Sequence, residues 1–567
     1  MKHRSIALAG AAAAVALTLT ACGASSGAAG GGSGAGGGDQ GTPATGGTLR
    51  FLSQSDFSHL DPARGYDGGV DNFYQLIYRT LTMWKPGSGH AQVVPDLATS
   101  LGTPSGNYKV WTFHLKSGLY FSNGQPITSQ DVKFGVERSW DPQAGIGSPY
   151  AKTLIAAPAS YKGPYVSGSL NTIATPDSKT IVFHLKQSYP DFSYAVQEPV
   201  YVPFPVGTGN DDSFDKHPIA SGPYEVSDYQ PGSSLTLVRN KRWQRATDPN
   251  RAARPDKIVF TYGLSAATID QRLLANQGTD QDAVGLWAIQ PSTVAKIQTA
   301  QMKARTVQGV QGCTGYVGLN TTKKPLNNLK VRQAIEWATD KQTIVQANGG
   351  TVLASPATAI ESPSVPDRTT TDVYATPGNT GNVTKAKALL AQAGLPHGFT
   401  MNVQVSNDPV SQAEAVAFQA GLARAGIKVQ IDAIATASFY QTIGTISQEG
   451  DSAMTGWCPD WPGGLTFLPP LFDGHLITSA GNTNLAQIND PSVNNQFASI
   501  AKMSSVTAQN QAYARMDVQI QKLAVVVPTV WDNTVMLVGT NVTGAAPSPP
   551  WDNGPDLVSL GLKNAGQ

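Results

Sequence analysis

The segment Gly456-Trp457-Cys458-Pro459-Asp460-Trp461 combines aromatic side chains with a single carboxylate. Two indole rings flank Asp460, and prolines and glycines restrict the loop around it. A carboxylate between apolar rings is costly to bury unless a cation compensates its charge. This composition is typical of a pocket for a ligand with an ammonium group. The alternative is a surface loop whose tryptophans pack into the core and whose Asp460 caps a turn, and the residues alone leave both open.

Catalytic motifs are absent from the sequence. It contains no zincin His-Glu pair, no phosphate-binding Gly-Lys-Ser/Thr loop and no Cys-x-x-Cys pair. The eight histidines are scattered, and His114 and His184 alternate with apolar residues as sheet residues do. Nothing brings a nucleophile, a base and an orienting group together. We therefore expect no catalytic residue, no metal ligand and no cofactor, and an enzyme is disfavoured.

The first 22 residues predict export from the cytoplasm. Lys2, His3 and Arg4 precede an apolar run over residues 6–19, which is typical of a secretory signal. This run is shorter than the ~20 residues that cross a bilayer. Leu19-Thr20-Ala21-Cys22 matches the lipobox of bacterial lipoproteins, in which the cysteine is acylated and becomes the new N-terminus. We expect a signal peptide over residues 1–21 and lipidation of Cys22; an ordinary signal peptide with an incidental cysteine is the alternative.

Residues 22–46 consist almost entirely of Gly, Ala and Ser and predict a flexible tether to the membrane. The remaining chain is too long for one hydrophobic core and implies two or more lobes. Lys and Arg number 40 against 39 Asp and Glu, so a nucleic-acid partner is not expected. If Cys22 carries lipid, Cys313 and Cys458 remain as a possible disulfide or as two free thiols.

Alternating apolar residues predict strands over residues 47–52, 111–115 and 181–185, the last two in one sheet. Apolar residues over 331–345 recur on one helical face. Further along, strand-like and helical segments alternate through residues 384–432, a β-α-β rhythm that favours an α/β lobe.

With these elements placed, the chain from about residue 48 onward resembles the family 5 extracellular solute-binding proteins, the oligopeptide- and dipeptide-binding proteins of bacterial ABC importers. The resemblance rests on short motifs that are individually weak but occur in the family's order. They are Leu60-Asp61-Pro62; Pro95-Asp96-Leu97-Ala98; Trp111-Thr-Phe-His-Leu-Lys with Phe121-Ser-Asn-Gly-Gln-Pro-Ile-Thr-Ser-Gln-Asp131-Val; Ser221-Gly222-Pro223-Tyr224 to Asn240-Lys-Arg-Trp243; Leu319-Asn320-Thr; Val331-Arg332-Gln-Ala-Ile with Ala338-Thr-Asp340; and Lys385-Ala386 to Ala393-Gly394.

This resemblance implies an α/β, bilobal clamshell of the periplasmic-binding-protein type (type II), with an extra subdomain inserted in the first lobe. Lobe I is expected to consist of three separate stretches of chain, and lobe II of one. The expected segments are lobe I over 47–77, 187–312 and 529–567, the inserted subdomain over 78–186, and lobe II over 313–528.

The resemblance also implies roles at the Trp-rich loop. In the oligopeptide binders a Gly-Trp-Cys-x-Asp loop pairs with the ligand backbone, and its Asp accepts the peptide ammonium. Asp460 is therefore the expected ammonium partner, with Gly456, Trp457, Cys458 and Trp461 as further ligand-binding residues. The family also pairs this loop cysteine with one at the position of Cys313, which implies a disulfide.

Two features depart from the family pattern. Pro459 removes one backbone donor beside Asp460, and residues 277–283 carry an insertion. No cation matches a peptide carboxylate, so ligand length stays open.

The expected function is a monomeric lipoprotein on the outer face of the cell membrane. It would capture a peptide, an oligopeptide by preference, and deliver it to ABC permease subunits. The alternatives are the same fold binding another solute, such as an oligosaccharide, a metal chelate or a signalling peptide, and a cell-envelope hydrolase.

Overall fold

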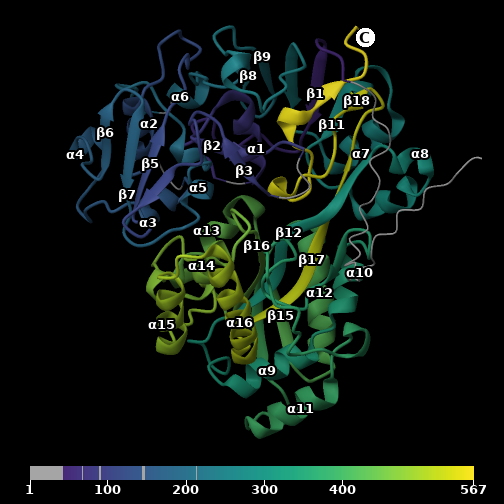
Figure 1. Ribbon diagram of the computed structural model, residues 1–567. Coiled ribbons are helices and arrows are strands. Elements are labelled where there is room, and N and C mark those ends of the chain that lie inside the picture. The colour runs from purple at the N-terminus through teal and green to yellow at the C-terminus, as the bar shows by residue number, and fades with distance from the viewer. Residues whose placement is uncertain (1–42, 67, 88–90, 143–146, 212, 567) are drawn as a thin grey trace, which may run out of the picture. The chain divides into compact units, whose positions relative to one another are not determined.

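The computed structural model describes residues 43–66, 68–87, 91–142, 147–211 and 213–566. The predicted signal peptide, Cys22 and the tether up to residue 42 lie outside these described residues. Three larger β-sheets organise the rest, and helices cover them (Figure 1). The tether prediction extended too far at its end, because Ala44 already pairs with Leu562 and the Gly46 amide donates to the Arg254 carbonyl.

A five-stranded sheet, here called the lobe I sheet, contains the predicted first strand. β1 lies parallel to both β10 and β11, and β9 and β8 continue the sheet in antiparallel order. The side chains of Leu49 and Phe51 point into a core that also receives Phe73 and Ile77 from α1 (Gly68–Ile77). In spatial order the strands are β11 (Ala283–Gly285), β1 (Thr48–Leu52), β10 (Lys257–Thr261), β9 (Ser234–Arg239) and β8 (Tyr224–Gln230).

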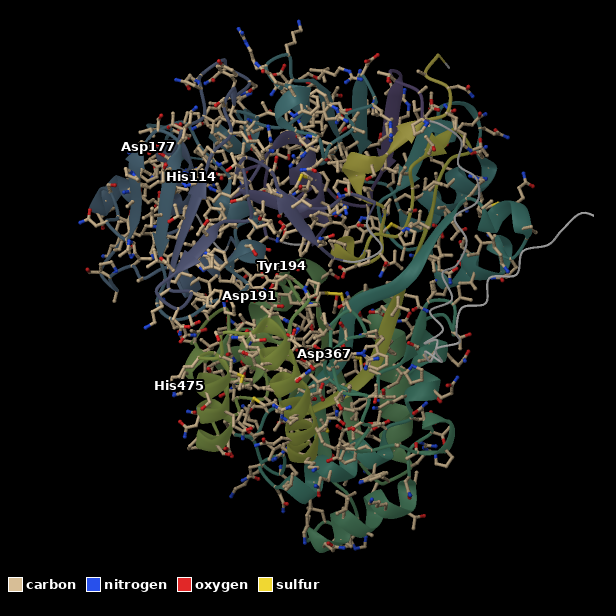
Figure 2. The ribbon with its side chains drawn as sticks, in the orientation of Figure 1. His114, Asp177, Asp191, Tyr194, Asp367 and His475 are labelled. Carbon is tan, nitrogen blue, oxygen red and sulfur yellow. A yellow bond between two sulfur atoms is a disulfide. The ribbon has the colours of Figure 1, made fainter. Side chains whose placement is uncertain are left out.

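A four-stranded antiparallel sheet, here called the inserted sheet, confirms that the two Phe-His strands share one sheet. β5 (Val110–His114) pairs directly with β7 (Thr180–His184), and Trp111 lies opposite Phe183. His114 and Asp177 lie on this sheet, at its exposed face (Figure 2). The outer strands are β4 (Thr103–Ser105) and β6 (Ile173–Asp177). Between β5 and β6 the chain forms α2 (Ser129–Arg138), α3 (Tyr150–Leu154) and α4 (Pro164–Ser167), and after β7 it forms α5 (Phe192–Ala195).

A six-stranded sheet, here called the lobe II sheet, has a core on each face. Val317 and Leu319 share one core with α9 to α12, whereas Tyr316 shares the other with α14 to α16. The two groups of helices can be followed in Figure 1. The strands in spatial order are β13 (Ala354–Pro356), β17 (Val526–Leu537), β12 (Thr306–Leu319), β16 (Ser452–Trp457), β14 (Thr400–Ser406) and β15 (Lys428–Ile434). The helices are α9 (Leu329–Ala338), α10 (Lys341–Asn348), α11 (Val383–Gln392), α12 (Pro409–Ala423), α13 (Phe439–Ile443), α14 (Leu468–Phe472), α15 (Pro491–Ile500) and α16 (Val506–Leu523).

The β-α-β rhythm predicted from the sequence is present in the lobe II sheet, since β14 and β15 lie parallel and α12 connects them. The single helical face expected over residues 331–345 is wrong, because the chain breaks there into α9 and α10. α9 ends at Ala338 because the next residue, Thr339, is extended, and Asp340 begins α10, as its carboxylate accepts the Thr343 amide at 3.0 Å. A side chain that caps free amides competes with continuation of the helix.

Two antiparallel strands connect the sheets. β12 and β17 pair from Thr306–Leu537 through Gly318–Val526 (Figure 1). Just beyond this ladder, Val538 pairs with Val284 of β11, which belongs to the lobe I sheet. The β12–β17 pair therefore belongs to the lobe II sheet and reaches the lobe I sheet at one end.

Two short acidic motifs hold buried ion pairs. Asp61 accepts two bonds from Arg138, one of them at 2.7 Å. Asp96 binds Arg79 at 2.7 Å and Arg251 at 2.8 Å, and all three side chains are at most 2% exposed. Each Arg guanidinium matches a planar carboxylate, so the charges are compensated where water is excluded. These motifs therefore hold the inserted segment to lobe I and serve the fold rather than a ligand.

Replacing Asp96 tests this structural role. Asp96→Ala leaves Arg79 and Arg251 buried with one carboxylate fewer, and breaking one side of a buried pair typically costs about 3–5 kcal/mol. We expect the free energy of unfolding, measured by urea denaturation, to fall by that amount. The control is Asp432→Ala on an exposed position of β15, which should leave unfolding unchanged within error. If Asp96→Ala unfolds at the same urea concentration as the wild-type protein, Asp96 does not have this structural role.

Candidate functional site

The strand that leads into the Trp-rich loop has a free backbone edge. β16 pairs with β12 along its whole length, from Ser452 to Trp457. On its other side it pairs with β14 only at Ala453. Within the described residues, no strand lies along this second edge beyond Ala453. An extended chain could therefore add there by backbone hydrogen bonds.

A disulfide fixes the start of the loop to β12. Cys313 and Cys458 are joined, and their Cα atoms are 4.1 Å apart. The sheet register places them together, because the neighbouring residues Thr314 and Trp457 lie opposite each other on β12 and β16. Asp460 thus lies two residues after a covalent anchor.

Two tyrosines from distant parts of the chain bind the Asp460 carboxylate. Tyr66 precedes α1 and donates its hydroxyl to Oδ1 at 2.5 Å. Tyr150 is the first residue of α3, in the part of the chain that carries the inserted sheet, and donates to Oδ2. Asp460 is partly buried and forms no ion pair among the described residues. Neutral donors, not cations, are its partners here.

The indole rings of Trp457 and Trp461 do not flank the Asp460 carboxylate as the sequence suggested. Trp461 is 2% exposed, packs in the core of the inserted sheet and lies 4.5 Å from the Tyr150 ring centre. Its indole N–H donates to Asp191 at 2.7 Å, a residue that lies just before α5 (Figure 2). Trp457 instead packs at the edge of the lobe II core, and its indole N–H donates to the Thr466 carbonyl. Tyr66 and Tyr150, not the indoles, contact the carboxylate.

Burial sets the charge state of this site. Loss of water raises the pKa of Asp460 to about 6, although the hydroxyls of Tyr150 and Tyr66 lower it in part. Burial and then the charge of Asp460 hold the pKa of Glu198 well above its usual range. A buried carboxylate without a cation binds protons more readily, and it gains most from a positively charged partner. The arrangement is therefore suited to accept an ammonium or guanidinium group.

Sequence reasoning placed Gly456, Cys458 and Asp460 on one loop but missed the groups that complete the site. Tyr66, Tyr150, Asp191 and Glu198 belong to no motif, and they reach the loop only through the fold. Gly456 and Cys458 are exposed beside the free edge of β16.

The fold and the site together define a solute-binding protein with two α/β lobes. A sequence model described as "Bacterial extracellular solute-binding proteins, family 5 Middle" matches residues 92–476. The chain belongs to this family, whose members are transport binding proteins and not enzymes. The resemblance in the motifs and the predicted fold class are thus confirmed.

Three similar proteins illustrate the range of names in the family. The probable D,D-dipeptide-binding periplasmic protein DdpA of Escherichia coli K12 is 26% identical over 484 residues, covering 83% of this chain and 85% of that protein. Heme-binding protein A of Haemophilus influenzae is 24% identical over 507 residues, covering 84% and 85%. The solved structure named clavulanic acid biosynthesis oligopeptide binding protein 2 has a TM-score of 0.86 and 31% identity, covering 92% of this chain and 96% of that one.

Among the described residues, no helix is both long enough and apolar enough to span a bilayer.

Removal of the disulfide tests how far the site depends on it. The bridge closes a loop with a sequence separation of 145 residues. Loss of a native disulfide typically costs about 2–5 kcal/mol. We expect Cys313→Ser/Cys458→Ser to unfold at lower urea concentration by a corresponding amount. The control is the wild-type protein under reduction, which should match the double variant. If the freshly purified wild-type protein shows two alkylatable thiols, the bridge is not formed and the account of the loop anchor fails.

Proposed function

We propose that this protein captures peptides and delivers them to the permease subunits of an ABC importer. The observation that carries the proposal is Asp460, a carboxylate at a lobe contact that only neutral hydroxyls compensate. A peptide ammonium would supply the missing positive charge. The charge-assisted hydrogen bond to the carboxylate is stronger than the neutral bonds that Asp460 makes with Tyr66 and Tyr150.

The free edge of β16 supports an extended ligand beside this carboxylate. A peptide strand there would form backbone hydrogen bonds next to Gly456 and Trp457, with its ammonium end directed to Asp460. Backbone pairing of this kind tolerates different side chains, as a peptide scavenger requires.

The names of relatives support the peptide class without fixing it. One relative is named for D,D-dipeptides and one solved structure for oligopeptides, whereas another relative is named for heme. We favour peptides because heme, an anion through its propionates, would gain nothing from a buried carboxylate. For this chain, an oligopeptide is the proposed ligand, and Gly456, Trp457, Cys458, Asp460 and Trp461 are the residues proposed to surround it.

The same proposal includes the cell biology predicted from the N-terminal residues. A lipid on Cys22 would hold a monomer on the outer face of the cell membrane, beside its transporter. We also propose the segment boundaries at 77/78, 186/187, 312/313 and 528/529. The strands support the first two, because the inserted sheet uses residues 103–184 and the lobe I sheet resumes at Tyr224. The last two fall within β12 and β17, the strands that connect the lobes.

Loss of the Asp460 charge tests the peptide proposal. Asp460→Asn preserves the shape of the side chain, so it should weaken peptides with a free amine by about 200- to 4,000-fold in Kd. N-acetylated versions should bind the wild-type protein poorly and lose little more in the variant. Isothermal titration calorimetry measures both effects, and this non-additivity is the signature of a direct ammonium contact.

The matched control is Asp432→Asn, which alters an exposed carboxylate of β15 and should bind both peptide forms as the wild type does. Equal binding of free and acetylated peptides, or losses that simply add, would contradict the role of Asp460. If no peptide raises the melting temperature of the wild-type protein, the peptide class itself fails.

Substitution of Cys22 tests the anchor. Cys22→Ser removes the thiol that takes the lipid, so the protein should appear in the medium or keep its signal peptide. Membrane fractionation and the mass of the mature N-terminus report the outcome. A Cys22→Ser protein that is fully processed and extracted only by detergent would rule out the lipoprotein assignment.

A further inference from the structure

A second carboxylate lies close to the Asp460 site. Glu198 is 3% exposed and accepts the Gln197 side-chain amide at 2.6 Å and the Ser148 hydroxyl at 3.2 Å. Both partners are neutral, and Glu198 forms no ion pair among the described residues. A fully buried acidic group without a cation is costly to keep ionised.

The charges of Asp460 and Glu198 act on the same two tyrosines, Tyr66 and Tyr150. Ser148, which binds Glu198, is two residues from Tyr150, which binds Asp460. The charges of Asp460 and Glu198 both raise the pKa of Tyr66 and of Tyr150, after burial itself. Glu198 and Asp460 therefore act on one polar cluster, and the charge of Asp460 disfavours ionisation of Glu198.

An unpaired hydroxyl gives an independent sign that this cluster is incomplete. Tyr201 lies three residues after Glu198 and is 0% exposed, yet its hydroxyl has no hydrogen-bond partner among the described residues. Burial, followed by the charge of Glu198, holds its pKa well above the usual range. Its ring packs against Phe183 and Phe192. Buried hydroxyls in native proteins are nearly always bonded, so this one has the capacity to bond a water or a ligand atom.

A small cavity borders the chain on either side of Glu198, although Glu198 itself does not line it. Gln197 and Pro199 line it together with Asp71 and Trp551. Asp71 is a further acidic group whose charge reaches Tyr66. Asp460, Glu198 and Asp71 thus all act on Tyr66.

A ligand with one ammonium group would neutralise only one of the two buried carboxylates. The other would remain charged at a large desolvation cost or would keep a proton. A ligand with two positive groups compensates both, and two charges at contact distance gain most where water is excluded. The charge balance of the site therefore favours a ligand that carries two positive groups at one end.

We propose that Glu198 binds a second cationic group of the ligand, so that the protein selects peptides with an N-terminal arginine or lysine. The α-ammonium group binds Asp460, and the side-chain guanidinium or ammonium group binds Glu198, with the Tyr201 hydroxyl nearby. This inference rests on the proposed peptide function and adds its specificity.

Citrulline provides a matched probe, because its side chain has nearly the shape of arginine without the charge. We expect the wild-type protein to bind Arg-Ala-Ala at least ten times more tightly than citrulline-Ala-Ala in isothermal titration calorimetry. In Glu198→Gln this preference should shrink to within about threefold, chiefly because the arginine peptide binds less well. The control is Glu336→Gln, which changes another buried, unpaired carboxylate that lies on α9 and should keep the full preference.

The outcomes separate this inference from the peptide proposal. If the wild-type protein binds both peptides equally while Asp460→Asn weakens both, Asp460 binds peptides but Glu198 does not select a cation. Retention of the full preference in a folded Glu198→Gln protein would overturn the role of Glu198 directly. The wild-type comparison alone remains decisive if Glu198→Gln does not fold. If neither peptide binds, the peptide function and this inference both fall.

Discussion

The contact between the lobes depends on how one loop compensates the partly buried carboxylate of Asp460. Asp460 receives the Tyr66 and Tyr150 hydroxyls, and the next residue, Trp461, donates to Asp191 and lies against the Tyr150 ring. These contacts join a loop of the lobe II sheet to residues of lobe I and the inserted sheet. Because all of the hydrogen-bond donors to Asp460 are neutral, the contact favours closure while leaving the charge available to a cation. In the proposed function, the lobe contact and ligand recognition therefore use the same atoms.

The remaining architecture holds this loop in position. β12 carries the disulfide partner of Cys458, pairs with β16 and continues beside β17 towards the lobe I sheet. Packing on both faces of the lobe II sheet supports this base. Buried pairs such as Asp96 with Arg251 hold the inserted segment to lobe I and need no ligand. Charged groups with cationic partners are thus structural here.

Local sequence patterns predicted most strands and the β-α-β order, because alternation and helical periodicity reflect burial on one face. They failed at Asp340, where a side-chain cap divides one apolar pattern into two helices. The motif comparison pointed to Asp460 and to Cys313 with Cys458. It could not reveal Tyr66 or Tyr150, which lie 394 and 310 residues from Asp460 and carry no local signal. Their role arises only when distant segments meet.

Proton release on peptide binding tests the central claim most directly. The pKa of Asp460 is raised to about 6, and a bound ammonium favours the ionised carboxylate, so binding should lower that pKa and release a proton. Calorimetry near pH 6, in buffers of different ionisation enthalpy, should show this release. It should become small near pH 7, where most of Asp460 is already ionised and the peptide amine is still protonated, and it should vanish in Asp460→Asn. Binding heats that do not depend on the buffer near pH 6, or an unchanged release in Asp460→Asn, would contradict the account.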